Sequence, residues 1–185
     1  NLVLACQSVG VHRYVQQSVA FLVADGSPSV LDETAPVRRT PVTASAADME
    51  AIVAESGLDW VILRGGLFYG PGTGRDDHWR QLARIGDLRC PNDGSDYVSL
   101  VHVTDMADAV ALAVGTAPSR AVLAVVDDAP VTYATLFRHV ASVEDGPEPQ
   151  AGGPAGLPSF RIANARARKV LGWTPRIATY RAGLA

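Results

Sequence analysis

A glycine-rich segment, Gly65–Gly74, is the first part of this sequence that could do chemistry. It reads GGLFYGPGTG and follows a run of apolar and β-branched residues, 58–64, that predicts a strand. Backbone N–H groups in such a loop can bind a phosphate, and the positive end of the next helix adds to the attraction. The spacing departs from the dinucleotide fingerprint, because Gly70 and Gly72 form G-x-G but Arg75 stands where the third glycine should be. A phosphate loop and a loop that only needs tight turns both remain open.

Single polar residues at the ends of predicted strands are further candidates. Ser18 ends one strand, so a helper role in catalysis and a simple strand-end hydrogen bond are both open. Arg64 closes the buried strand and is expected to pair with a structural carboxylate such as Asp105. His102 also lies in a strand, where a structural histidine with satisfied hydrogen bonds is the expected role.

No pattern in the chain predicts a metal site. Asp76, Asp77 and His78 are consecutive, and consecutive side chains do not converge on one ion. They predict a solvated helix start, where negative charge suits the helix dipole. Cys6 and Cys90 lie far apart without a CxxC motif, which indicates free thiols in a reducing compartment.

Composition excludes several classes of protein. The chain has 185 residues, of which 48% are hydrophobic and 19% charged, as in a folded globular protein. A net charge of −3 without a basic cluster argues against nucleic-acid binding. No apolar run reaches the ~18 residues of a membrane span, and no leader precedes Asn1. We therefore expect a cytoplasmic protein that contacts neither nucleic acid nor a membrane.

Helical and strand patterns alternate along the chain. This alternation predicts a mostly parallel α/β sheet, whose ligand site lies outside the carboxyl ends of the strands. Ser18, the Gly65–Gly74 loop and the turn at 103–105 would share that edge. Helices are expected at 2–9, at 43–56 with Thr43 as its cap, at 77–85, after a cap at Thr104 or Asp105, from a cap at Thr132 through 140, and at 163–171. Strands are expected at 13–18, 58–64, 98–103 and 121–126. The segment 144–158 is expected to be a loop.

Four ordered segments share a pattern with one family. They read NLVLAC…GVHRYV over 1–15, VILR…YGPG over 61–72, VHVTDMADA over 101–109 and ARKVLGWTP over 167–175. Together they resemble the extended short-chain dehydrogenase/reductases, the NAD-dependent epimerase/dehydratase family. The resemblance implies a Rossmann-like α/β fold, of which this chain is the C-terminal two-thirds, with a small C-terminal substrate-binding lobe. It places a partial Rossmann-like core at 1–126, with substrate-lobe segments inserted at about 72–100, and the C-terminal lobe and closing helices at 127–185.

The chain departs from this family at the residues that carry the usual activity. The family's glycine motif and most of its cofactor site belong to an N-terminal half that would precede Asn1. Its catalytic Tyr-x-x-x-Lys pair falls on Val42 and Ala46, and the only lysine, Lys169, has Ala165 four residues before it. The tyrosine is the family's acid/base and the lysine lowers its pKa, which valine and alanine cannot do.

The resemblance also implies which residues form the site. Ser18 and Tyr69 are the candidate catalytic residues, since Tyr69 lies in the loop that borders the nicotinamide in the family. NAD or NADP would be the cofactor, and the substrate would be a small molecule. The expected cofactor contacts are Gly65, Gly66 and Leu67, and the expected substrate pocket is Val19 (at the family's second serine), Val42, Ala46, Phe68 and His102.

Two functions follow from this pattern of matches and departures. The first is an epimerase, dehydratase or reductase of a sugar nucleotide or natural-product intermediate that works by a non-standard mechanism. The second is a redox-inactive relative that binds a ligand or partner, or isomerises or cyclises a substrate without cofactor. A third hypothesis is a non-functional fragment, whose exposed parallel sheet edge would be an aggregation risk. A homodimer through the helices at 1–9 and 43–56 is expected if the chain pairs as family members do, and a monomer is the alternative.

Overall fold

A parallel sheet forms the centre of the structure, a computed structural model that describes residues 2–185. Its 3 strands lie in the order β1–β3–β8, with β1 at Tyr14–Val19, β3 at Trp60–Gly65 and β8 at Ala121–Val125. Tyr14 pairs with Trp60 at the start of β1, and Val61 pairs with Ala121 at the start of β8. All three carboxyl ends therefore meet at one edge, as the sequence predicted for 13–18, 58–64 and 121–126.

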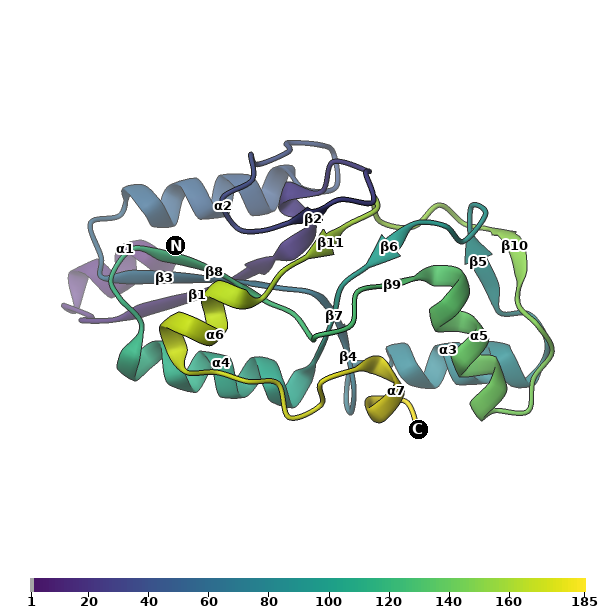
Figure 1. Cartoon of the computed structure of the whole chain (residues 1–185). Helices are drawn as coiled ribbons and strands as arrows, with labels where there is room; N and C mark the ends of the chain where they lie inside the picture. The colour runs from purple at the N-terminus through teal and green to yellow at the C-terminus, as the bar shows by residue number, and fades with distance from the viewer. Residues whose placement is uncertain (1) are drawn as a thin grey trace.

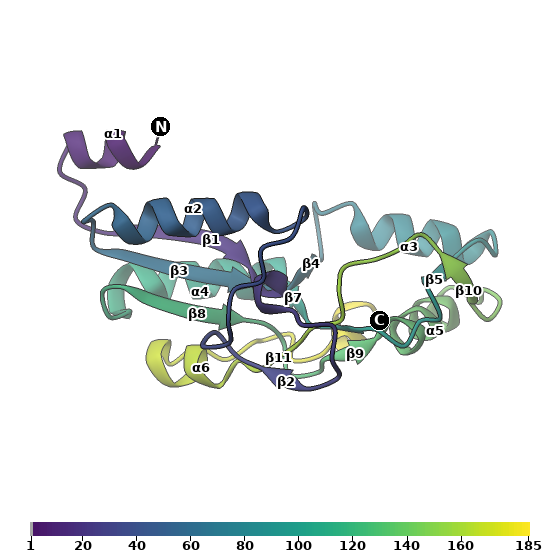
Figure 2. The same ribbon diagram turned by 90° about the horizontal axis from the view of Figure 1, so that it is seen from above.

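Helices cover both faces of this sheet, as Figures 1 and 2 show. One face carries α1 (Leu2–Ser8) and α2 (Ala44–Glu55), and the other carries α4 (Val103–Thr116) and α6 (Ala165–Leu171). Alternate residues of β3 point to opposite faces. Ile62 packs in the cluster under α1 and α2, while Leu63 packs in the cluster under α4 and α6. This two-sided burial explains the continuous apolar run of β3.

A helical lobe lies beside the sheet, on the right in Figure 1. We define the lobe by these elements: α3 (Arg75–Arg84), α5 (Tyr133–Val143), β5 (Arg89–Pro91) and β10 (Gln150–Gly153). The rings of Trp79 on α3 and Phe137 on α5 meet edge to face, with their centroids 5.4 Å apart. This aromatic contact joins the two helices in the interior of the lobe.

Short elements join the sheet to the lobe. Two segments that the sequence predicted as loops contain strands. The remaining elements are η1 (Ala20–Val23), β2 (Val30–Leu31), β4 (Leu67–Tyr69), β6 (Tyr97–Val98), β7 (Leu100–His102), β9 (Val131–Thr132), β11 (Arg161–Ile162) and α7 (Tyr180–Gly183). The segment 65–74, expected as a loop, contains β4, which pairs with β7. The segment 144–158, also expected as a loop, contains β10, which pairs with β5. Both strands depend on partners distant in sequence, which local patterns do not reveal.

Helix starts agree with the sequence at one position and differ at another. Thr132 caps α5, because its hydroxyl accepts a hydrogen bond from the N–H of Thr135 (3.3 Å). The expected cap of α4 at Thr104 or Asp105 is wrong: His102 caps this helix, and its Nδ1 accepts the N–H of Thr104 (3.3 Å). An imidazole nitrogen can replace a hydroxyl or carboxylate as a cap acceptor, so His102 has the structural role expected for it.

No helix within residues 2–185 is both long enough and apolar enough to cross a membrane.

Candidate functional site

The carboxyl edge of the sheet brings together Ser18 and Arg64, which are paired neighbours on β1 and β3. Paired residues of parallel strands point to the same face, so both side chains lie on the side of α2. Ser18 is 3% exposed, and its Oγ is buried without a hydrogen-bond partner among residues 2–185. A buried hydroxyl with no partner is costly unless a bound molecule satisfies it. Ser18 is therefore the candidate residue whose geometry most directly suggests a ligand.

A buried ion pair holds α2 against this edge. Arg64 donates from Nε to Oε1 of Glu50 (2.9 Å) and from Nη2 to Oε2 (2.7 Å), a bidentate pair. The side chains of Arg64 and Glu50 are only 6% and 10% exposed. The third guanidinium contact runs from Nη1 to the carbonyl of Glu33 (3.2 Å). One arginine thus fixes both the helix and the loop before it.

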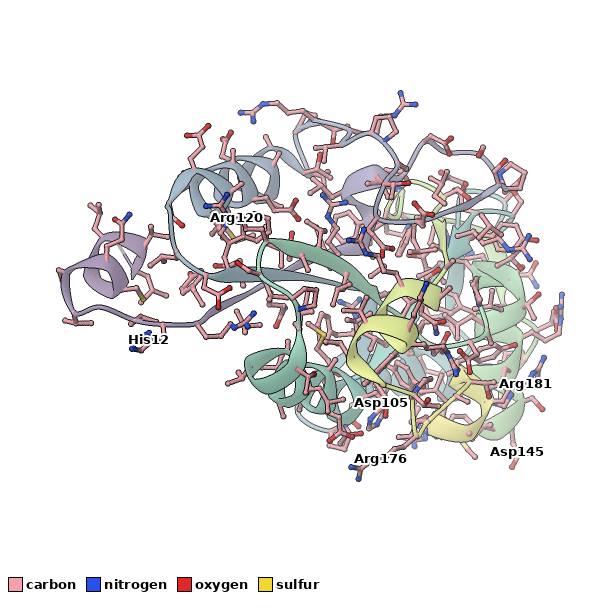
Figure 3. The ribbon with its side chains drawn as sticks, turned by 60° about the vertical axis from the view of Figure 1, so that its left-hand side comes forward. His12, Asp105, Arg120, Asp145, Arg176 and Arg181 are labelled. Carbon is pink, nitrogen blue, oxygen red and sulfur yellow. The ribbon has the colours of Figure 1, made fainter. Side chains whose placement is uncertain are left out.

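Arg64 pairs with a carboxylate, as the sequence predicted, but the partner is Glu50 and not Asp105. Asp105 faces the opposite side of the sheet, where its carboxylate accepts the N–H groups of Arg176 (2.8 Å) and Ile177 (3.1 Å). Figure 3 shows Asp105 and Arg176 where the segment after α6 passes the start of α4. Asp105 therefore fastens the C-terminal segment, and Glu50 balances the charge of Arg64.

The start of α2 carries Val42 and Ala46, the two positions that the sequence resemblance assigned to a tyrosine and a lysine. Val42 is 60% exposed, and Ala46 is partly buried. Just beside them, Thr43 is buried and its hydroxyl donates to the carbonyl of Arg38 (2.5 Å). This bond holds the helix start in place. The two positions therefore offer apolar surface at a fixed location and no polar atom for proton transfer.

The residues predicted to contact a cofactor lie where the chain passes from β3 to β4 and packs closely on its neighbours. Gly65 has no room for a side chain, because a Cβ would lie 2.8 Å from the ring of Phe68. At Gly66 a Cβ would lie 2.5 Å from the carbonyl oxygen of Ser99. Leu67 is buried, and its N–H donates to that same carbonyl (2.8 Å). Gly66 is thus required by the close approach of this backbone to that of Ser99 and Leu100, whereas Gly65 makes room for the partly buried ring of Phe68 on the side of α4.

The glycine loop that follows does not present a phosphate site. The N–H of Gly70 donates to both carboxylate oxygens of Asp76 (3.0 and 2.8 Å). Gly70 has a φ of 105° and lies so close to His102 that a Cβ would meet its Nε2 at 2.4 Å. An acidic side chain already occupies the first N–H donor of the loop, so the tight-turn interpretation fits the structure.

Tyr69 lies in the interior of the protein rather than at a surface. Its side chain is 0% exposed, and its ring packs edge to face with His102 at 5.2 Å. Burial, followed by the charges of Asp127 and Asp105, raises the pKa of the Tyr69 hydroxyl far above its ordinary value. The hydroxyl lies 3.5 Å from the carbonyl of Thr179 in the C-terminal segment. This placement argues against the substrate-facing role predicted for Tyr69.

Two buried carboxyl groups near the sheet edge were missed by the sequence interpretation. The Glu33 side chain is 2% exposed, burial raises its pKa, and Arg166 approaches its Oε1 at 3.7 Å. Asp127 follows β8 and is 2% exposed; burial raises its pKa to about 7. Its Oδ1 accepts the N–H of Ala129 (3.0 Å), and its Oδ2 is buried without a partner. Neither residue belongs to a recognisable motif, although an acidic residue directly after a buried strand was a usable signal for Asp127.

The remaining predicted residues take ordinary places. Val19 ends β1 opposite Gly65 and is partly buried on the side of α4. Asp77 and His78 are exposed in the first turn of α3. Cys6 and Cys90 are free thiols. Within residues 2–185, no three His, Cys, Asp or Glu side chains are grouped so that they could hold a metal ion.

Comparison with known proteins shows which family this chain is similar to. A model of the NAD dependent epimerase/dehydratase family matches residues 1–124. The 3-diazoavenalumate denitrifying reductase of a Streptomyces species is 35% identical over 208 positions, which cover 100% of this chain and 67% of that protein.

Solved structures show the same relationship. MoeE5 in complex with UDP-glucuronic acid and NAD is 28% identical, with a TM-score of 0.81 over 99% of this chain and 66% of that one. The UDP-glucose 4-epimerase of Thermotoga maritima, at 20% identity and a TM-score of 0.84, shares the fold. This chain spans about two thirds of the length of these relatives. By its matched residues and its parallel α/β sheet, the chain belongs to the NAD-dependent epimerase/dehydratase family of extended short-chain dehydrogenase/reductases.

Proposed function

We propose that this protein is an NAD(P)-dependent reductase of a natural-product intermediate whose mechanism uses no tyrosine acid. A sugar nucleotide is the second substrate class that the family supports, and a redox-inactive binding protein is the second function. Two comparisons favour the reductase: the Streptomyces relative is named a reductase, and the MoeE5 structure contains NAD.

One observation carries the proposal: the start of α2 is held firmly in place, yet it presents no acid or base. The Arg64–Glu50 pair fixes α2, and Thr43 holds the start of that helix. Yet the Tyr and Lys positions hold Val42 and Ala46. A reaction at this site must therefore proceed without a proton from a tyrosine at that position.

Ser18 could bind a polar group of a small molecule, whereas the side chains of Val42 and Ala46 could not. The unpartnered hydroxyl of Ser18 can donate to a substrate or nicotinamide oxygen at the carboxyl edge of the sheet. Val42 and Ala46 have no polar atoms with which to bind a ribose. A bound NAD(P)H would supply a hydride, and the task of this chain would be to position the acceptor and keep water away with apolar side chains.

The chemistry of the acceptor explains how a tyrosine could be dispensable. The relative's name describes a denitrifying reductase of a 3-diazo compound. If the acceptor is an arenediazonium, hydride adds to the ring carbon while the carbon–nitrogen bond breaks and its electron pair leaves with N2. Atoms and charge balance without any added proton. Carbonyl reduction, by contrast, needs a proton for the oxygen. A diazo acceptor is therefore the substrate class that we propose for this site.

The direct test uses the full-length gene product, titrated with NADH and NADPH and then supplied with an aryl diazonium carboxylate or an aldehyde. We expect cofactor binding in the micromolar range and NAD(P)H oxidation coupled to N2 release with the diazonium acid only. Because diazonium salts react slowly with reduced cofactors alone, the rate without protein is subtracted. Failure to bind either cofactor would establish the redox-inactive alternative, and turnover of the aldehyde would contradict the argument from the missing acid.

Ser18 gives a second prediction, because its hydroxyl has no hydrogen-bond partner within residues 2–185. Ser18→Ala should leave the midpoint of urea unfolding of the free protein unchanged or raise it, while turnover falls about tenfold, the effect of one lost hydrogen bond to a ligand. Ser45→Ala, at an exposed position on α2, is the matched control and should change neither quantity. Unchanged turnover in Ser18→Ala would remove this residue from the site.

We also propose that the chain pairs as a homodimer through α1 and α2. Leu2, Leu4 and Val9 are 66%, 63% and 77% exposed, and Ile52 on α2 is 48% exposed. A groove of about 230 Å³ between the two helices includes Leu2 and Ile52 in its lining. Exposed apolar side chains beside such a groove are typical of protein interfaces.

Light scattering on the purified chain tests the dimer. We expect the mass of two chains for the wild type and of one chain for Leu4→Glu/Ile52→Glu. Val114→Glu, on α4 at the opposite face and 55% exposed, is the control and should stay dimeric. A wild-type chain that stays monomeric at high concentration would contradict the proposal.

A further inference from the structure

The helical lobe has a polar pocket that lies apart from the sheet edge. Its volume is about 250 Å³, and it is lined by Thr135, Arg138, His139 and Ser142 of α5 together with Arg181 of α7. The four α5 residues follow the spacing i, i+3, i+4, i+7 and therefore share one face of that helix. The opposite face of α5 packs in the core of the lobe. Figure 3 shows Arg181 at the surface where α7 meets α5.

The charges that line this pocket are all of one sign. It contains two guanidinium groups and no carboxylate, in a chain whose net charge is −3. Arg138 donates to Glu148 through Nε alone (2.8 Å), and both side chains are more than half exposed. Arg181 lies over the ring of Tyr180 at 5.1 Å and takes part in no ion pair within residues 2–185. Exposed pairs are weak, so both guanidinium groups have donors available for an anion.

His139 adds a buried nitrogen without a partner. Its Nε2 is buried and makes no hydrogen bond, while its ring packs on Tyr180 with centroids 5.5 Å apart. Burial and then the charge of Arg181 lower its pKa. A backbone hydrogen bond with Arg181 opposes them, and the charge of Arg80 on α3 adds to the lowering. An anion bound beside His139 would oppose these effects and raise its pKa again. The imidazole is therefore placed to report on anion binding in this pocket.

The hydroxyl groups of the pocket are also oriented as donors. Thr132 donates its hydroxyl hydrogen to Oγ1 of Thr135 (2.9 Å), which leaves the hydrogen of Thr135 free to bond elsewhere. Ser142 lies two turns further along the same face and can donate in the same way. Guanidinium and hydroxyl donors that line one pocket, with no carboxylate among its lining residues, are the groups that bind tetrahedral oxyanions.

We propose that this pocket binds a phosphoryl group, either as inorganic phosphate or as the phosphate of a small monoester. The pocket is larger than a phosphate ion, so a monoester such as glycerol phosphate has room for its organic part. The site is independent of the proposed reductase function, since none of its residues belongs to the sheet edge around Ser18.

Nuclear magnetic resonance of the imidazole protons tests the site directly, because the chain has only 4 histidines. Phosphate added at constant ionic strength should shift the His139 resonance with saturation and raise its pKa. The resonances of His12, His78 and His102 should not move. A monoester that saturates at lower concentration than inorganic phosphate would assign the site to small phosphate esters, and the reverse order would assign it to the free ion.

Substitutions identify the donors. Arg181→Gln should weaken phosphate binding about tenfold or more, the usual effect of a lost charge-assisted hydrogen bond. Arg89→Gln, which removes an equal charge from a 52% exposed side chain of the same lobe, should bind as the wild type does. A His139 resonance that phosphate does not move more than chloride does, or equal losses in both variants, would overturn the proposal.

Discussion

Exchanging Arg64 for methionine should lower the free energy of unfolding by about 3–5 kcal/mol, because Glu50 would keep a buried charge without a partner. Glu50 is 10% exposed and bonds Arg64 through both carboxylate oxygens. The loss would reach beyond the pair, since Arg64 also holds the carbonyl of Glu33. Urea unfolding followed by circular dichroism measures the effect, and Arg64→Met/Glu50→Leu should recover much of it by removing both charges.

The chain offers a matched control on the same helix. Asp48 of α2 pairs with Arg39, and their side chains are 57% and 58% exposed. Asp48→Asn should leave the unfolding midpoint almost unchanged, because water screens an exposed pair. If Asp48→Asn and Arg64→Met were equally destabilising, burial would not be the source of the effect at Arg64.

Asp127→Asn should change how stability depends on pH more than any other single carboxyl substitution that we propose. Burial raises the pKa of Asp127 from 3.8 to about 7. The native state thus binds its proton more tightly than the unfolded chain does. The stability that this proton contributes is complete below about pH 4 and is lost as the pH rises through about 7. The difference in unfolding free energy between variant and wild type should therefore shift by up to ~4 kcal/mol from about pH 4 to pH 8, in favour of the variant.

Asparagine suits this test because it keeps an oxygen that can accept the N–H of Ala129. Asp25→Asn is the control, since hydrogen bonds from Ser27 lower the pKa of that exposed carboxyl. The Asp25 variant should gain no stability at alkaline pH. Parallel pH profiles for Asp127→Asn and the wild type would show that Asp127 is ionised in the native protein at neutral pH.

The sequence predicted those elements whose pattern is local. The β-branched run before Gly65 predicts β3, and the hydroxyl of Thr132 predicts the start of α5. Partners were harder to predict, because a pattern along one strand does not name the residue opposite. Arg64 was expected to find a carboxylate, yet two candidates lay at comparable places, and only the fold shows that Glu50 shares its face while Asp105 lies on the other side.

The candidate site was predicted unevenly for the same reason. Ser18 could be placed at the sheet edge because the carboxyl ends of parallel strands meet there. The burial of Tyr69 could not, since it results from Gly183 and Thr179, residues more than a hundred positions later that pack against its ring and hydroxyl. The pairing of β4 with β7 likewise joins segments that show no common pattern.

The parallel pairing of the central sheet has a kinetic consequence. Tyr14 must find Trp60, and Val61 must find Ala121, so each ladder closes a long stretch of chain before any strand hydrogen bond forms. Closing such loops costs entropy early and makes folding slow relative to helical domains. The first of these loops, between Tyr14 and Trp60, contains both Glu50 and α2, which Arg64 holds in the folded protein. The sheet edge around Ser18 is therefore complete only when β1, α2 and β3 have come together.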